Sequence, residues 1–113
     1  MADDCLFCRI VRGEIPAKLV FEDEHCIAFR DINPQAPTHV LVVPREHLES
    51  LDRTTDSLVI GRLLLAAAAI ARQENVAEVG YRTVINTNRA AGQTVFHLHV
   101  HLLGGRPLEW PPG

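Results

Sequence analysis

Histidine alternates with apolar residues in the segment His97-Leu98-His99-Val100-His101-Leu102-Leu103, and this alternation constrains the fold more than any other feature of the sequence. Successive side chains of a β-strand point to opposite faces of a sheet, so a period of two is typical of a half-buried strand. We therefore predict a strand over 96–103 that buries its apolar side chains. The three histidines then lie together on the other face of that strand.

The remaining patterns predict a single α+β domain over residues 1–113, because 47% of the residues are apolar and a chain of this length supports one core. Apolar periodicity and turn residues predict helices over 6–12 and 57–74, and strands over 18–22, 26–30, 40–43 and 81–86. The core face of the long helix is expected to consist of Ile60, Leu63, Leu64, Ala67, Ile70 and Ala71.

The charge and hydropathy of the chain exclude several classes of function. A net charge of -3 provides no broad basic surface for nucleic acid or for an anionic membrane. The longest apolar run, 63–71, is less than half of the roughly 20 residues that span a bilayer. The N-terminus, Met1 to Asp4, is acidic where a signal peptide is basic. We expect a cytoplasmic protein that binds neither nucleic acid nor membrane.

The spacing of the three histidines favours a reactive histidine over a shared metal ion. At about 3.3 Å per residue, the first and third Cα atoms lie roughly 13 Å apart, which is too far for their rings to meet at one ion. A neutral imidazole is nucleophilic near pH 7, and a neighbouring ring can orient it or donate a proton. A solvated polar face that is rich in histidine is the alternative interpretation.

A phosphate-binding loop is the second candidate element, because Ala90-Ala91-Gly92-Gln93-Thr94 leads directly into the histidine segment. Glycine permits close approach of the backbone to a ligand, and Gln93 and Thr94 offer donors for a phosphoryl oxygen. A plain turn is the alternative. The sequence contains no Walker loop, nucleophile elbow or Rossmann fingerprint that would place the chemistry elsewhere.

These motifs resemble the Hint branch of the histidine-triad (HIT) family over essentially the whole chain. The resemblance rests on the H-x-H-x-H pattern, the loop Asn33-Pro34-Gln35-Ala36-Pro37-Thr38-His39, Gly92-Gln93, Gly104-Gly105-Arg106 and the ending Trp110-Pro111-Pro112-Gly113. It implies a HIT-like fold with an antiparallel sheet of about five strands, one long helix and one or two short ones. It also implies hydrolysis of purine nucleoside phosphoramidates through a covalent nucleotidyl-histidine.

The resemblance assigns roles to individual residues. His99 corresponds to the attacking nucleophile, His101 contacts the phosphate, and His39 supports the nucleophile's strand. Asp31 corresponds to the carboxylate that binds the ribose hydroxyls, and a turn aspartate is its alternative interpretation. The apolar slot for the base corresponds to Leu6, Phe7, Ile10, Phe29, Ile32 and Leu41. The phosphate and leaving-group contacts correspond to Asn86, Gly92, Gln93, Thr94 and Val95.

One of these positions departs from many family members, which carry serine where this chain has Thr94. The hydroxyl that would donate a proton to the departing amine is kept, but a β-branched side chain has less freedom about χ1.

The resemblance further implies a homodimer in which the tail over 106–113 docks near the partner's site, with Trp110 helping to select the leaving group. Catalysis by this route requires no metal, because backbone amides and His101 neutralise the phosphoryl oxygens. Two alternatives remain: a dinucleoside polyphosphate hydrolase, as in the Fhit branch, and a non-catalytic nucleotide-binding module.

The pair Cys5-Leu6-Phe7-Cys8 predicts a structural zinc site. The chain has three cysteines, and an odd number argues against a disulfide framework. Two thiolates with this spacing can bind one tetrahedral ion. In some bacterial relatives that the chain resembles, the set is completed by residues that correspond to His47 and His97. Reduced thiols and a redox-active pair are the alternatives.

Overall fold

The computed structural model describes residues 4–113 and contains one antiparallel sheet in the strand order β1-β2-β3-β5-β4. The strands are β1 Leu19–Glu22, β2 Cys26–Arg30, β3 Thr38–Pro44, β4 Tyr81–Val84 and β5 Val100–Gly104, and the helices are α1 Leu6–Val11 and α2 Ser57–Gln73. Two 3-10 turns, Leu51–Arg53 and Arg89–Ala91, lie in the connections. The predicted α+β class and the antiparallel sheet of five strands are confirmed. Of the acidic N-terminal segment, residues 1–3 lie outside the described part.

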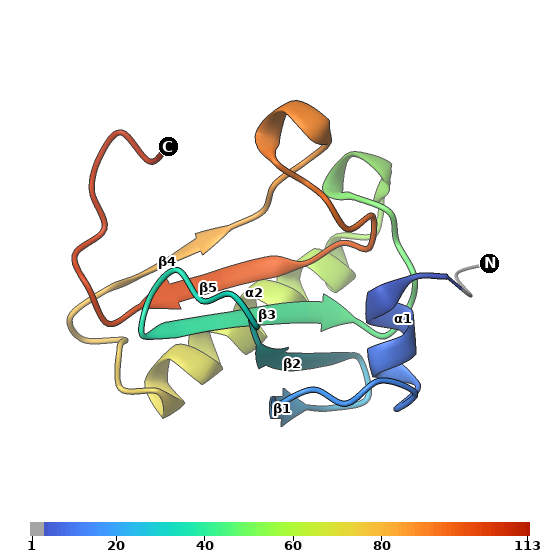
Figure 1. Ribbon diagram of the computed structural model, residues 1–113, viewed down its shortest axis with the longest axis horizontal. Coiled ribbons are helices and arrows are strands. Elements are labelled where there is room, and N and C mark those ends of the chain that lie inside the picture. The colour runs from blue at the N-terminus through green and yellow to red at the C-terminus, as the bar shows by residue number, and fades with distance from the viewer. Residues whose placement is uncertain (1–3) are drawn as a thin grey trace.

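The two faces of the sheet pack against different helices. Strand β3, at the centre of the sheet, is covered on both faces and is buried along its whole length. Val40 and Val42 point toward α2, which lies behind the sheet in Figure 1, and Leu41 and Val43 belong to a second apolar cluster with Phe7 of α1. Leu41 pairs with His101 of β5 in the ladder, so the histidine is on the face away from α2. The site therefore lies on the face that α2 leaves uncovered, beside α1.

Helix α2 covers the other face through small and branched residues. Asp56 caps its N-terminus by accepting the Leu58 N–H at 2.9 Å, as expected of an aspartate at this position. The fully buried positions are Leu63, Ala66, Ala67, Ile70 and Ala71.

The predicted core face of α2 is wrong at Leu64, whose side chain is 38% exposed. Successive residues of a helix lie about 100° apart around its axis, so Leu64 is rotated away from the stripe that is centred on Leu63 and Ala67. None of the helices within residues 4–113 is long and apolar enough to cross a membrane.

The last strand is shorter than the sequence predicts, because β5 begins at Val100 and leaves His97 and His99 ahead of it. The ladder between β3 and β5 ends at the pair Val42 and Val100. Just beyond it, β3 ends at Pro44, which has no N–H to donate. The Pro44 carbonyl instead accepts the His97 Nε2–H at 2.8 Å, and the Leu98 N–H bonds to the Leu48 carbonyl at 2.6 Å. The segment that contains His97 and His99 therefore lies outside the ladder, whereas His101 is within it.

The turn after β5 joins the tail to the loop before β3. Gly105 has φ +90 in the left-handed region, and a Cβ there would lie 2.9 Å from Cβ of Pro37, so this position requires glycine. The next residue, Arg106, donates to the Gln35 carbonyl at 2.9 Å. Farther on, Arg82 of β4 donates to the Glu109 carbonyl at 2.9 Å, and Trp110 is 82% exposed.

Candidate active site

The ring of His99 is held in one tautomer by the backbone. Its Nδ1 lies 2.7 Å from the carbonyl oxygen of His97, and a carbonyl only accepts, so Nδ1 carries the proton. The lone pair is therefore on Nε2. Phe7 packs edge-on against this ring, with centroids 5.0 Å apart and an interplanar angle of 89°. These contacts hold a nucleophilic nitrogen in a fixed direction.

His39 and His101 form an ordered hydrogen-bond chain beside that nucleophile. The Gln35 N–H donates to Nδ1 of His39 at 2.9 Å, so His39 carries its own proton on Nε2. Nε2 of His39 lies 2.9 Å from Nδ1 of His101 and donates to it. His101 must then carry its proton on Nε2, where it can donate to a ligand oxygen. Its ring lies 5.0 Å from that of His99, centroid to centroid.

The environment keeps these histidines neutral near pH 7. Burial, together with the neighbouring rings of His99 and His39, lowers the pKa of His101 to about 4, while Asp31 opposes the shift. Burial also lowers the pKa values of His99 and His39. The site therefore offers neutral donors and one neutral lone pair.

Asp31 lies at the end of β2 and faces the same group. Its Oδ2 lies 3.4 Å from Nε2 of His39, and its side chain is 19% exposed. Its Oδ1 accepts the Asn33 N–H at 2.8 Å, which is the turn interaction that the alternative interpretation predicts. A carboxylate has about four lone-pair positions, so these contacts leave acceptor capacity for a ligand hydroxyl.

The residues of the expected base slot separate into two sets. Phe7, Phe29 and Leu41 are buried together, and Ile10 packs against them. Leu6 is 44% exposed, and Ile32 is 100% exposed in the loop after β2. The structure thus gathers four of the six apolar residues between α1 and the sheet and leaves the other two more exposed.

Gln93 differs most from the expectation that its side chain donates to a phosphoryl oxygen. The side chain is hydrogen-bonded to other groups of the protein. Its Nε2 donates to the carbonyls of Glu49 at 2.8 Å and Val95 at 3.2 Å, and its Oε1 accepts the Asn88 N–H at 2.8 Å. Its backbone N–H donates to the Asn88 carbonyl at 3.1 Å. The residue is 4% exposed and holds the loop together instead of offering a free donor.

The other residues of the expected phosphate loop remain accessible. Thr94 is exposed, and within residues 4–113 the N–H groups of Thr94 and Val95 have no hydrogen-bond acceptor. Asn86 is half-buried in the segment between β4 and the loop. These groups can meet a phosphoryl oxygen.

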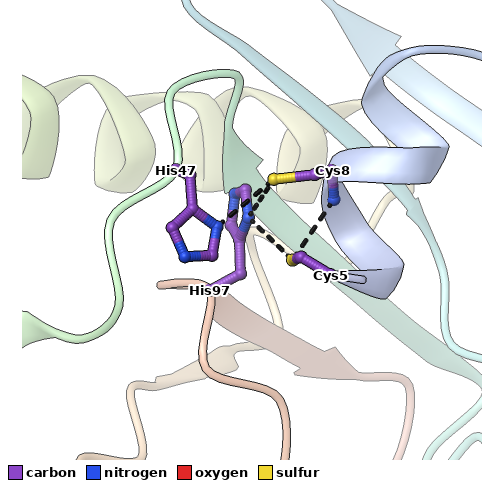
Figure 2. A group of neighbouring side chains, drawn as sticks. All are labelled: Cys5, Cys8, His47 and His97. Carbon is purple, nitrogen blue, oxygen red and sulfur yellow. Dashed lines mark hydrogen bonds between the residues drawn. The ribbon is translucent and has the colours of Figure 1, made fainter. Parts of the chain in front are cut away.

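Figure 2 shows a second cluster, which is formed by Cys5 at the N-cap of α1, Cys8 within α1, His47 of the loop after β3 and His97 ahead of β5. Nδ1 of His97 lies 3.4 Å from both sulfur atoms, and Nδ1 of His47 lies 3.2 Å from the Cys8 sulfur. All four donor atoms lie within 4.8 Å of one another.

The donor set of this cluster fits a tetrahedral zinc ion. Zinc bonds of about 2.3 Å to sulfur and about 2.0 Å to nitrogen place adjacent sulfur and nitrogen ligands about 3.5 Å apart. His97 donates its Nε2–H to the Pro44 carbonyl, so its Nδ1 lone pair faces the thiols. The lone pair of His97 and the two sulfur atoms therefore face the same point, where a cation can bind them together with Nδ1 of His47.

A second group of potential metal ligands fits a metal ion less well. It consists of Asp31, His39 and His101. Nε2 of His39 carries the proton that the Gln35 N–H forces onto it, so it has no lone pair for an ion. We assign this group to proton positioning.

A cleft of about 570 Å³ opens beside the cysteine–histidine cluster and the end of the loop that contains Thr94, and it is not lined by His99, His101 or Asp31. Its lining residues are Asp4, Cys5, Leu6, His47, Glu49, Thr94, Val95 and Phe96. The sequence did not indicate Glu49 or Phe96, and the backbone groups of Pro44 and Gln35 were also missed. For Gln35, the motif around His39 was the only available signal.

Comparisons with known proteins match most or all of the chain. The HIT domain matches residues 12–108. A HIT-like protein of Synechococcus elongatus is 56% identical, with all of both chains covered. The purine nucleoside phosphoramidase of Escherichia coli K12 is 48% identical over 96% of this chain and 92% of its own. A HIT family hydrolase from Legionella pneumophila superposes with a TM-score of 0.94 at 50% identity, covering 96% of this chain and 99% of that one.

Burial of neutral His101 predicts loss of stability in acid. The unfolded chain takes up a proton near the ordinary pKa of 6.5, whereas the folded chain resists protonation until about pH 4. The contribution is therefore complete above pH 6.5 and is lost as the pH falls toward 4. In His101→Asn, we expect the free energy of unfolding to fall less steeply over this range, by on the order of 1 kcal/mol per pH unit.

Urea unfolding at several pH values measures this slope. His25→Asn, which removes an exposed histidine, is the matched control. A slope in His101→Asn that equals the wild-type slope would contradict the assignment of a buried neutral ring.

Proposed function

Because the chain belongs to the HIT domain family, we propose that it hydrolyses purine nucleoside phosphoramidates to a nucleoside 5'-monophosphate and an amine. The observation that carries the proposal is the tautomer of His99, whose Nδ1–H is donated to the His97 carbonyl and whose Nε2 lone pair is therefore available for attack. The name of the Escherichia coli relative, at 48% identity, supports this choice of reaction.

In the proposed first step, Nε2 of His99 attacks the α-phosphorus and the phosphorus–nitrogen bond breaks. The leaving amine takes a proton, for which the exposed hydroxyl of Thr94 is the proposed donor. Nε2–H of His101 and the N–H groups of Thr94 and Val95 stabilise the charge on the phosphoryl oxygens. The product is a nucleotidyl-histidine.

In the second step, a water molecule attacks the same phosphorus, its proton returns to the Thr94 oxygen that was deprotonated in the first step, and the bond to Nε2 of His99 breaks. Neutral His99 is regenerated, and the nucleoside monophosphate leaves. The base is proposed to lie against the apolar cluster of Phe7, Phe29 and Leu41, and the ribose hydroxyls donate to Asp31. Each role uses a group that already has a fixed orientation.

Replacement of His99 tests the proposal. His99→Gly removes the attacking nitrogen, so we expect kcat/KM for an adenosine phosphoramidate to fall by more than about a thousandfold, with binding of adenosine monophosphate changed by less than about threefold. Continuous fluorescence release of an aromatic amine measures the rate. His25→Gly is the surface control, and diadenosine triphosphate tests polyphosphate cleavage. Appreciable turnover by His99→Gly would exclude His99 as the nucleophile.

We propose that Cys5, Cys8, His47 and His97 bind a structural zinc ion. The proposal is supported by the spacing of the four donor atoms and by the orientation of the His97 lone pair. When bound, the ion links α1 to the loop after β3 and to the segment before β5. Thiolate ligands and free cysteines suit a reducing compartment, which supports a cytoplasmic location.

Metal analysis of protein purified without a histidine tag tests the zinc proposal. We expect about one zinc per chain in the wild type and almost none in Cys5→Ser/Cys8→Ser, with a lower melting temperature because α1 loses its link. Cys26→Ala, which removes a buried thiol on β2, is the matched control and keeps the zinc. Wild-type protein that contains no metal and melts at the same temperature as Cys5→Ser/Cys8→Ser would overturn the proposal.

We also propose that two copies of the chain form a homodimer through α2 and β4. On α2, Leu58 is 62% exposed and Leu65 is 73% exposed, and residues at this spacing lie on one face of a helix. Strand β4 is at the edge of the sheet, so one side of its backbone is unpaired within the subunit. The tail that carries Trp110 leaves from the same side of the molecule, where it can reach a partner (Figure 1).

Light scattering at micromolar concentration tests the dimer. We expect twice the mass of one chain, and we expect Leu65→Glu to shift the protein to one chain because a carboxylate is costly to bury in an apolar interface. Leu19→Glu alters a 49%-exposed leucine on β1, at the opposite edge of the sheet, and leaves the mass unchanged. A wild-type mass of one chain would contradict the proposal.

A further inference from the structure

Asn88 adopts a backbone conformation that side-chain-bearing residues almost never adopt. Its φ is 70 and its ψ is 177, which lies in a region accessible essentially to glycine alone. The only other non-glycine residue with positive φ within residues 4–113 is Asn75, with φ 62 at the end of α2. A conformation of this kind persists only where surrounding interactions hold it.

Gln93 supplies those interactions on both sides of Asn88. Its Oε1 accepts the Asn88 N–H at 2.8 Å, and its backbone N–H donates to the Asn88 carbonyl at 3.1 Å. Asn88 is exposed, and within the described residues its own side chain makes no hydrogen bond that could hold it. The strained residue is therefore fixed by Gln93 and not by its own side chain.

The same glutamine connects Asn88 to the rest of the site. Its Nε2 donates to the Val95 carbonyl, inside the loop, and to the Glu49 carbonyl, in the segment that follows His47. With 4% exposure, its hydrogen bonds are shielded from water and are expensive to break. The side chain of Gln93 thus holds both ends of the loop over 88–95 in place relative to Glu49, in the segment after His47.

We propose that Gln93 is a positioning residue, which holds Asn88 in its strained conformation and thereby orients the Thr94 and Val95 N–H groups before a phosphate is bound. The effect on catalysis rests on the proposed phosphoramidate hydrolysis. The effect on the conformation of Asn88 rests on the hydrogen bonds alone. A glutamine that contacts the phosphate directly is the competing role, and it needs the side chain to be free.

Amide hydrogen exchange on the ligand-free protein tests the structural part without any substrate. Gln93→Met keeps the length of the side chain and removes its hydrogen bonds, so the Asn88 N–H is expected to exchange at least about tenfold faster than in the wild type. Unchanged exchange at Asn88 would overturn the proposal, because a glutamine directed only at phosphate does not protect this amide.

Kinetics of the same variant test the positioning role. Loss of loop orientation is expected to lower kcat for an adenosine phosphoramidate by about 10- to 100-fold and to change KM by less than about threefold, since the donors act most strongly on the transition state. In the double variant Gln93→Met/Asn88→Gly, kcat is expected to recover by at least about half of the loss on a logarithmic scale. Glycine adopts the required conformation without the hydrogen bonds from Gln93. Gln93→Met/Asn75→Gly, the matched control, shows no recovery.

The single variant Asn88→Gly keeps the proposal testable if Gln93→Met does not fold. It relieves the strain, so the melting temperature is expected to rise by about 3 to 6 °C, and by more than in Asn75→Gly. No rise, or no rescue of kcat by Asn88→Gly, would overturn the positioning role. Absence of turnover in the wild type would instead overturn the proposed function, while the exchange and melting results would still decide the role of Gln93.

Discussion

The hydrogen bond from the His99 ring to the His97 carbonyl is the interaction on which the rest of the site depends. An imidazole has one lone pair and one proton, and this 2.7 Å contact decides which nitrogen has which. Two further backbone groups act in the same way, because Pro44 accepts from His97 and Gln35 donates to His39. The main chain thus gives each imidazole a different orientation of donor and acceptor, as the proposed nucleophile, hydrogen-bond chain and metal ligand require.

Helix α1 connects the two functional clusters. Cys5 and Cys8 begin the helix, and Phe7 between them packs against the rings of both His97 and His99. The same phenylalanine belongs to the apolar cluster proposed for the base. A helix of six residues has little stability of its own, so tertiary contacts must hold it in place. A metal link at its first turn would therefore also stabilise the position of the proposed nucleophile, His99, and of the apolar cluster proposed for the base.

In the proposed phosphate loop, residue type alone does not distinguish a ligand contact from a structural one. Glutamine and threonine are both possible phosphate donors, and the sequence could not separate them. In the folded chain, the amide of Gln93 finds buried carbonyls from Glu49 and Val95, whereas the hydroxyl of Thr94 stays exposed. Local rules are broken at the neighbouring Asn88, and such departures concentrate at functional sites where the surroundings enforce them.

His47 and His97 were added to the two cysteines only by the resemblance to the HIT family. The residue pattern itself predicted the strands, the helices, the common face of the histidines and the pair Cys5 and Cys8. These follow from periodicity, capping and spacing, which are local properties of residue type. Only the tertiary structure decided where β5 begins, that Leu64 and Ile32 are exposed, and which nitrogen of each ring carries a proton. Those outcomes depend on backbone donors and acceptors far away in the chain, such as Pro44 for His97. Almost every residue offers the same backbone groups, so residue identity does not encode which of them will meet.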